Sequence, residues 1–178
     1  MVTAYVQSTM NRRNFIKGTT IASGIMSFPN IIPAKLLGKN SPSNKITVGM
    51  IGTGNHGIHR NLNMFLRQPD AKVLAVSDVF KSRMAKAHKM TNEHYKSNDC
   101  SMHSDFREIL DRKDIDAVMI STPDHWHALM SSMAIRRGKD VICEKPTLTV
   151  AEGRYIADLV KKTGRIFQTS TEDRSLFI

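Results

Sequence analysis

The 178-residue sequence predicts an α/β fold with a doubly wound parallel sheet, and two observations support that prediction. Short apolar runs alternate with longer segments of helical composition along residues 45–171, which is the pattern of parallel strands joined by helices on both faces of a sheet. The first apolar run ends at a cluster of glycines, as the turn from a strand into a helix often does in such sheets.

The first half of the folded region begins with an apolar run at residues 46–51, which predicts a strand. The segment at residues 55–66 predicts a helix that ends before Pro69, because proline does not continue a helix. Residues 72–76 are again apolar and predict the second strand. Residues 81–90 are helical in composition and predict the second helix.

In the second half, Phe106, Ile109 and Leu110 form a short apolar face ahead of a buried-looking strand at residues 117–120. The remaining elements repeat the same alternation: a helix at residues 127–137, a strand at 140–143, a helix at 151–162 that ends at Gly164, and a strand at 166–168. No internal repeat or low-complexity tract interrupts this order, so a single folded domain is expected from about Lys45.

The glycine cluster has the spacing of a dinucleotide-binding turn. Gly52, Gly54 and Gly57 lie in a G-x-G-x-x-G pattern directly after the first strand. Gly52 would permit the tight turn, Gly54 would let the backbone approach a pyrophosphate, and Gly57 would let the helix pack on the sheet. The phosphates would then lie at a helix N-terminus, where free N–H groups favour negative charge. We therefore expect a Rossmann-type sheet.

Asp78 ends the second apolar run, about 20 residues after Gly57, where an acid is expected to bind the adenosine ribose hydroxyls. A carboxylate there would repel a 2′-phosphate, so NAD is the expected cofactor and NADP is less favoured. Lys81 and Arg83 lie nearby and could soften that preference. The alternative is a plain strand-to-helix turn in which the glycines are incidental and Asp78 caps a helix.

The first 44 residues have the features of an export signal followed by a linker. They contain five basic residues and no acidic residue, and the pair Arg12–Arg13 precedes Phe15 and a weakly apolar, uncharged stretch. This resembles a bacterial twin-arginine leader, which carries folded cargo and would deliver the protein to the periplasm. The apolar stretch is too short to span a bilayer stably. A disordered basic arm is the alternative.

Charge and cysteine content argue against two other classes of function. The net charge of +10 suggests nucleic acid at first sight, but half of it lies in the first 44 residues and the rest is interspersed with acids, without an aromatic-interleaved basic stripe. Cys100 and Cys143 do not form a C-x-x-C motif, and Cys143 is expected to be a small buried apolar residue. His125 and His127 have H-x-H spacing without an evident third ligand, so no metal is expected.

Two loops follow expected strands and should open at the carboxyl edge of the sheet, where ligands bind in such folds. One is the segment at residues 121–127, with the sequence STPDHWH, and the other is Glu144-Lys145-Pro146. Lys145 is the best candidate for chemistry, since a lysine at a partly desolvated strand end can position or protonate a substrate oxygen beside a nicotinamide. A surface lysine that caps a turn is an equally good interpretation of the spacing alone.

Together the segments GTGNHG, SDV, STPDHWH and CEKP resemble the N-terminal domain of the glucose-fructose oxidoreductase, inositol dehydrogenase and rhizopine-catabolism family (Gfo/Idh/MocA) over residues 45–171. By this resemblance, Lys145 lies near the hydride-transfer centre. The residues that the resemblance implies along the cofactor are Gly52, Thr53, Gly54, Asn55, His56, Gly57, Asp78, Thr122, Pro123, His125, Trp126, His127, Glu144 and Lys145. The implied substrates are sugars, cyclitols and their derivatives. Some members are glycosidases that use tightly bound NAD without net redox change.

Family members continue into a second α/β domain that supplies substrate contacts and the usual oligomer interface. This sequence stops at Ile178, so residues 172–178 are interpreted as the truncated start of that absent domain. We therefore expect an NAD(P)-binding domain of an oxidoreductase that is inactive as a fragment and whose oligomerisation is doubtful. A stand-alone, non-catalytic nucleotide-binding module is the alternative from another class of function.

Overall fold

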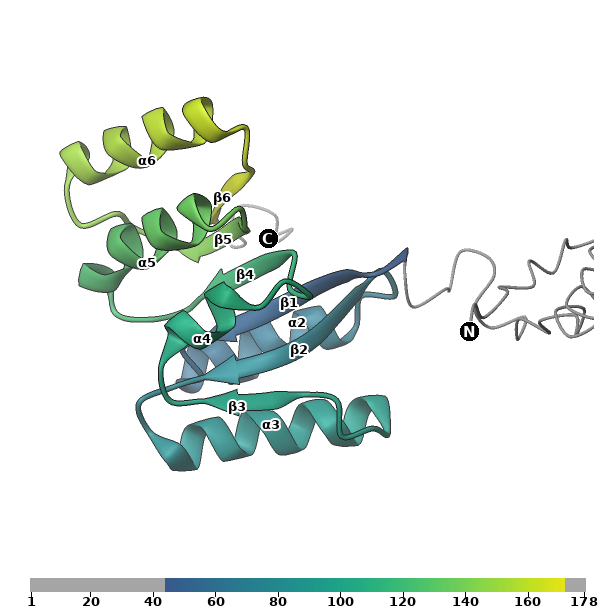
Figure 1. Ribbon diagram of the computed structural model, residues 1–178. Coiled ribbons are helices and arrows are strands. Elements are labelled where there is room, and N and C mark those ends of the chain that lie inside the picture. The colour runs from purple at the N-terminus through teal and green to yellow at the C-terminus, as the bar shows by residue number, and fades with distance from the viewer. Residues whose placement is uncertain (1–43, 172–178) are drawn as a thin grey trace, which may run out of the picture.

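A computed structural model describes residues 44–171, which form one parallel sheet with helices on both faces (Figure 1). The strands are β1 (Ile46–Ile51), β2 (Ala71–Ser77), β3 (Ser101–His103), β4 (Ala117–Ile120), β5 (Asp140–Glu144) and β6 (Phe167–Ser170). Their order in the sheet is β3-β2-β1-β4-β5-β6, and every neighbouring pair is parallel. The strand order reverses beside β1, so a ligand crevice is expected outside the carboxyl ends of β1 and β4. The predicted doubly wound parallel sheet is confirmed.

Helical segments connect the strands: η3 (Gly57–Leu62), α2 (Asn63–Leu66), α3 (Lys81–Tyr95), α4 (Phe106–Asp111), α5 (Asp124–Arg136) and α6 (Val150–Thr163). The segment η3 is π-helical and continues directly into α2, so the helix predicted at residues 55–66 is present with a widened first part. The last helix, α6, starts with a capping box between Thr149 and Glu152. It ends at Gly164, whose φ of +69° suits a residue without a side chain.

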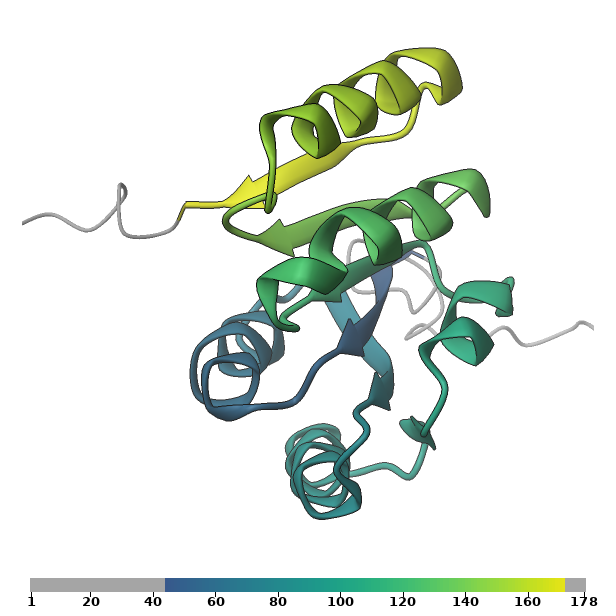
Figure 2. The same cartoon turned by 90° about the vertical axis from the view of Figure 1, so that its left-hand side faces the viewer.

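The core lies in two layers, one on each face of the sheet (Figure 2). On one face, Ile58 and Leu62 of η3 and Met84 of α3 pack against the strands. On the other face, Ile109 of α4 and Ile135 of α5 are buried to 0% and 1% exposure, and α6 adds further apolar side chains. Full burial of each such side chain contributes about 1.5–3 kcal/mol, so both helical layers hold the strand ends in place.

On the face of the sheet that η3 covers, the helices within residues 44–171 leave the second half of the sheet open. A hollow of about 700 Å³ lies there, between η3 and α2 on one side and Met119, Ile142 and Gln168 of the strands on the other. None of the residues predicted to bind a cofactor lines it. Within the same residues, no helix combines the length and the apolar character that crossing a membrane requires.

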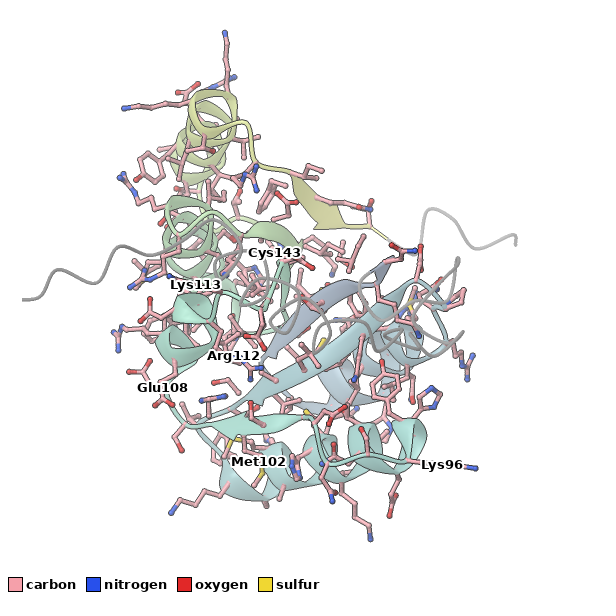
Figure 3. The ribbon with its side chains drawn as sticks, turned by 45° about the vertical axis from the view of Figure 1, so that its right-hand side comes forward. Lys96, Met102, Glu108, Arg112, Lys113 and Cys143 are labelled. Carbon is pink, nitrogen blue, oxygen red and sulfur yellow. The ribbon has the colours of Figure 1, made fainter. Side chains whose placement is uncertain are left out.

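Three elements differ most from the sequence-based expectation, and β6 also lies slightly later, at Phe167–Ser170 rather than 166–168. The edge strand β3 was not predicted, because it has three residues, is only partly buried and carries Ser101 and His103 rather than an apolar run. The helix α3 extends to Tyr95 and ends where Lys96 adopts a left-handed conformation, pointing outward in Figure 3. The helix α5 begins at Asp124 rather than residue 127, since Pro123 takes the N-cap position with an extended backbone. The predicted leader and residues 172–178 lie outside the described residues.

Candidate functional site

The glycine turn lies at the carboxyl end of β1 and is held by both neighbouring strands. The backbone N–H of Gly52 donates to the Ser77 carbonyl at 2.8 Å, and Ser121 donates to the Ile51 carbonyl at 2.7 Å. Gly52 has a φ of +89°, and a Cβ there would lie 2.5 Å from the Ser121 carbonyl oxygen. A Cβ on Gly57 would lie 2.3 Å from the Gly52 carbonyl oxygen. Both positions therefore require glycine for the protein's own packing.

Gly54 differs from the other two glycines because its missing side chain faces open space. The nearest atom to a Cβ built there is Nη1 of Arg83, at 3.9 Å. The fold therefore tolerates a side chain at this position, and what glycine preserves is room for something outside the protein. This is the geometry that a pyrophosphate approaching the turn needs.

Asp78 follows β2 and is bound to the glycine turn. Its Oδ2 accepts hydrogen bonds from the Thr53 backbone N–H at 2.7 Å and from the Thr53 hydroxyl at 3.0 Å. Its Oδ1 accepts from the backbone N–H of Phe80 at 2.8 Å. The N-cap of α3 is Phe80, so Asp78 is not the cap of that helix. Among residues 44–171, Oδ1 accepts this one hydrogen bond, so it can also accept a ligand hydroxyl.

A cleft of about 480 Å³ opens between these segments and the loop after β4. Of the predicted cofactor residues, those that line the cleft are Gly52, Gly54, Asp78, Thr122, Pro123 and Trp126. Phe80 and Arg83 form one further wall, and the segment from Ser104 to Arg107 forms the wall opposite. The hydrogen bond from the Arg107 backbone N–H lowers the pKa of Asp105. The carboxylate of Asp105 is also paired with the Arg107 guanidinium at 3.0 Å.

A second set of polar contacts joins the glycine turn to the ends of β4 and β5. The Asn61 side chain donates to the Ser121 hydroxyl at 2.8 Å and to Glu144 Oε1 at 2.8 Å. The same Glu144 oxygen lies 3.0 Å from Nε2 of His56. Asn61 lies in η3 and is 4% exposed. One buried amide in η3 thus joins the STPDHWH loop to the Glu144-Lys145 strand end, and His56 adds a contact from the glycine turn to the same Glu144 oxygen.

His127 lies beneath the two loops, with 1% exposure. Its Nδ1 lies 2.7 Å from the Pro146 carbonyl oxygen, and its Nε2 lies 2.7 Å from the Thr122 carbonyl oxygen. The ring therefore connects the loop after β4 to the loop after β5, and both of its nitrogens are engaged by the protein. His125 and Trp126 lie in the first turn of α5 with their ring centroids 5.9 Å apart, and Trp126 also lines the cleft.

Lys145 follows the end of β5, next to Glu144, and its side chain is exposed. The sequence allowed two interpretations, a partly desolvated lysine and a surface lysine that caps a turn, and the described residues do not bury this side chain. Asn55 and His56 are exposed at the turn, and Nε2 of His56 contacts Glu144. No group of three or more His, Cys, Asp or Glu side chains within residues 44–171 is arranged to hold a metal ion.

The cysteines do not belong to the cleft. Cys143, labelled in Figure 3, is 2% exposed, and burial raises its pKa to about 12. Burial likewise raises the pKa of Cys100 to about 11. The prediction that Cys143 is a small buried apolar residue is confirmed.

Sequence reasoning missed Asn61 and the aromatic residues Phe80 and Phe106 of the cleft walls. Asn61 had a recognisable signal, because it occupies an inward position between Ile58 and Leu62 on the otherwise apolar face of the first helix. A polar residue at such a position needs a buried partner. Phe80 and Phe106 had no comparable signal, since both are ordinary apolar residues at the start of a helix.

Comparison with known proteins places the chain in a family. Residues 46–171 match the GFO_IDH_MocA family profile, described as an oxidoreductase family with an NAD-binding Rossmann fold. "Glycosyl hydrolase family 109 protein 2" of Shewanella sp. (strain ANA-3) is 27% identical over 89% of this chain and 38% of its own length. A "Glycosyl hydrolase family 109 protein" of Saccharopolyspora erythraea is 35% identical over 67% of this chain and 27% of its own length.

A solved structure supports the fold as well. The apo scyllo-inositol dehydrogenase from Lactobacillus casei matches with a TM-score of 0.65 and 24% identity, over 75% of this chain and 38% of that one. This chain thus spans about 38% of the length of the Shewanella relative and of the Lactobacillus enzyme. The chain belongs to the Gfo/Idh/MocA oxidoreductase family, and residues 46–171 are its NAD(P)-binding Rossmann domain.

Proposed function

We propose that the 480 Å³ cleft holds NAD, and that the whole protein transfers a hydride between this cofactor and a sugar- or cyclitol-like alcohol. The observation that carries the proposal is the convergence of three features in one cleft: the open side of Gly54, the free lone pair of Asp78 and the loop at Thr122. The pyrophosphate would lie against Gly54, and an adenosine ribose hydroxyl would donate to Asp78. Bound nicotinamide would supply the hydride acceptor.

Titration of NAD into the purified chain by calorimetry tests the binding step. Gly54→Ala places a methyl group in the space reserved for the pyrophosphate, where the nearest protein atom to it is Nη1 of Arg83 at 3.9 Å, so it should weaken binding at least about tenfold. Its urea unfolding midpoint should stay close to that of the wild type. A folded wild-type chain that does not bind millimolar NAD would overturn the proposal.

Lys145 is proposed to orient the substrate hydroxyl beside the nicotinamide. Its exposure at the carboxyl end of β5 leaves its ammonium available to a substrate, and polypeptide outside residues 44–171 would supply the desolvation that sharpens its chemistry. In a protein that carries the remaining substrate-binding part, Lys145→Met should lower NADH formation from a polyol by about 100-fold while leaving NAD affinity unchanged. An equal loss of NAD affinity would assign Lys145 to cofactor binding instead.

A second candidate activity is an NAD-dependent glycosidase, and the names of the two curated relatives favour it. Such an enzyme would cleave a glycoside with substoichiometric NAD and without net accumulation of NADH. A nitrophenyl glycoside separates the two candidates, because nitrophenol release and NADH absorbance are recorded in the same cuvette. Sustained NADH production from a free sugar would contradict the glycosidase assignment.

We also propose that residues 1–44 direct export through the twin-arginine route to the periplasm. The paired Arg12 and Arg13, the following apolar stretch and the absence of acidic residues support this. A domain that must fold around a dinucleotide would need a route for folded cargo. Fusion of residues 1–44 to a reporter tests it, with Arg12→Lys/Arg13→Lys as the control, and cytoplasmic retention of the unmodified fusion would contradict it.

A further inference from the structure

The hollow of about 700 Å³ beside η3 exposes a stretch of parallel sheet and shares no lining residue with the cofactor cleft. Its floor is a row of three register partners, Met119 of β4, Ile142 of β5 and Gln168 of β6. The helices α5 and α6 pack on the opposite face of these strands (Figure 2). Parallel sheets are almost always covered on both faces, so this floor calls for a cover that residues 44–171 do not supply.

The walls of the hollow indicate the chemistry of the cover that fits it. Met64 and Phe65 of α2 add apolar surface to the apolar part of the floor. Among residues 44–171, the ionisable side chains that line the hollow are all basic, namely His59, Arg60 and Arg67. A segment that covers the hollow should therefore bring apolar side chains to the floor and carboxylates to the basic rim.

The chain carries a segment of this composition directly beside the hollow. Thr171 lines the hollow just after β6, and residues 172–178 follow it with the sequence EDRSLFI. The segment begins with two acidic residues, Glu172 and Asp173, and continues to an apolar triplet at residues 176–178. Both kinds of side chain that suit the hollow therefore follow Thr171 closely in the sequence.

The available length of chain lets this segment cross the hollow. The distance from β6 to β4 is two strand spacings, about 10 Å. Phe177 lies six residues after Thr171, and six residues span about 9 Å as a helix and at most about 20 Å when extended. Phe177 can therefore reach the floor in either conformation. Residues 1–43 suit the hollow less well, because they contain basic residues and no acidic residue to meet its basic rim.

From this arrangement we propose that residues 172–178 cover the hollow and bury the side chain of Phe177 against its floor. The cover completes the second face of the sheet over β4, β5 and β6. It also removes an exposed apolar surface that would otherwise favour association with other proteins. The inference does not depend on the assignment of the cleft to a dinucleotide, because the two sites have no lining residue in common.

Thiol labelling of Ile142→Cys under native conditions reports whether the floor is covered. The labelling rate is measured in the 178-residue chain, in the chain without residues 172–178, in the chain without residues 1–43, and with Phe177→Asp, which keeps the length but makes burial of that side chain costly. Leu129→Cys is the matched control, because Leu129 is 49% exposed on α5, which packs on the other face of the sheet. The parent chain corrects for the two native cysteines, which are buried. Urea unfolding midpoints establish that each variant is folded.

Labelling of Ile142→Cys should be at least about tenfold faster without residues 172–178 and also with Phe177→Asp, whereas labelling of Leu129→Cys should change by less than about twofold. If the deletion does not fold, Phe177→Asp carries the test. Equal rates for Ile142→Cys with and without these changes would overturn the inference. A rate that falls as the protein concentration rises would overturn it in favour of a second copy of the chain as the cover. Acceleration only on removal of residues 1–43 would overturn it in favour of that segment.

Discussion

Replacement of Asn61 by alanine tests whether one buried amide joins the loop at Ser121 to the strand end at Glu144. The change removes two hydrogen bonds, one to the Glu144 carboxylate and one to the Ser121 hydroxyl. A hydrogen bond to a charged group contributes about 1.5–3 kcal/mol and a neutral one about 0.5–1.5 kcal/mol. Asn61 also borders the 700 Å³ hollow, so water can reach the site and recover part of this loss. A decrease of about 2 kcal/mol in the free energy of unfolding is therefore expected.

Urea unfolding followed by fluorescence of Trp126, the single tryptophan of the chain, measures this change. With a slope of about 2 kcal/mol/M, the midpoint should fall by about 1 M. Asn63→Ala is the control, because its side chain makes one exposed hydrogen bond to the His59 carbonyl and should change stability by less than about 0.5 kcal/mol. Asn61→Ala should also weaken NAD binding, since the loop at Ser121 and the Glu144-Lys145 strand end lose their common partner. If both variants had the same midpoint as the wild type, the linking role of Asn61 would be refuted.

Three further outcomes follow from the structure. Gly57→Ala should lower the free energy of unfolding by at least about 2 kcal/mol, because the added methyl group meets a backbone carbonyl at 2.3 Å. Gly54→Ala should lower the same free energy by less than about 0.5 kcal/mol. Equal urea midpoints for the two variants would contradict this. The thiol of Cys143 has a pKa raised from 9.0 to about 12, so its contribution to stability is complete below pH 9 and is lost as pH rises toward 12. Relative to Cys143→Val, the wild type should lose about 2 kcal/mol between pH 8 and pH 10.5, as measured by urea unfolding, and a constant difference would count against the burial effect. The hydrogen bond from Arg112 lowers the pKa of Asp114. The stabilisation that this carboxylate contributes is therefore present above the unfolded pKa of 3.8 and is lost as pH falls below it. Asp114→Asn should lose less stability than the wild type between pH 5 and pH 2, and identical acid unfolding curves would show that the pair is not involved.

Much of the fold could be predicted because it depends on local patterns. The apolar runs that became β1, β2, β4 and β5 are recognisable without any knowledge of their neighbours, since strands buried on both faces are nearly continuous in apolar residues. The edge strand β3 could not be predicted in this way, because its pairing with β2 rather than its composition makes it a strand. The start of α5 at Asp124 was also missed, because the helical pattern becomes apolar only after the first residues of this helix.

The candidate site, like the fold, could be predicted only where it depends on local sequence. The positions of Gly52, Gly57 and Asp78 could be read from spacing, because a turn between a strand and a helix has the same requirements wherever it occurs. The contact between Asn61 and Glu144 could not, since the two residues are 83 positions apart and meet only because β1, β4 and β5 are neighbours in the sheet. The spacing of Lys145 left a desolvated and a surface position equally open, and only the fold showed that its side chain is exposed in this domain.

The sequence by itself thus determined the parallel sheet, the glycine turn and the acid placed beside it, because periodicity and turn chemistry act over a few residues. Only the tertiary structure decided how those groups are paired. It bound Asp78 to Thr53, paired Arg107 with Asp105 and left Arg83 beside the open side of Gly54. Pairing of charges depends on distances between segments that are remote in the chain, and strand order sets those distances.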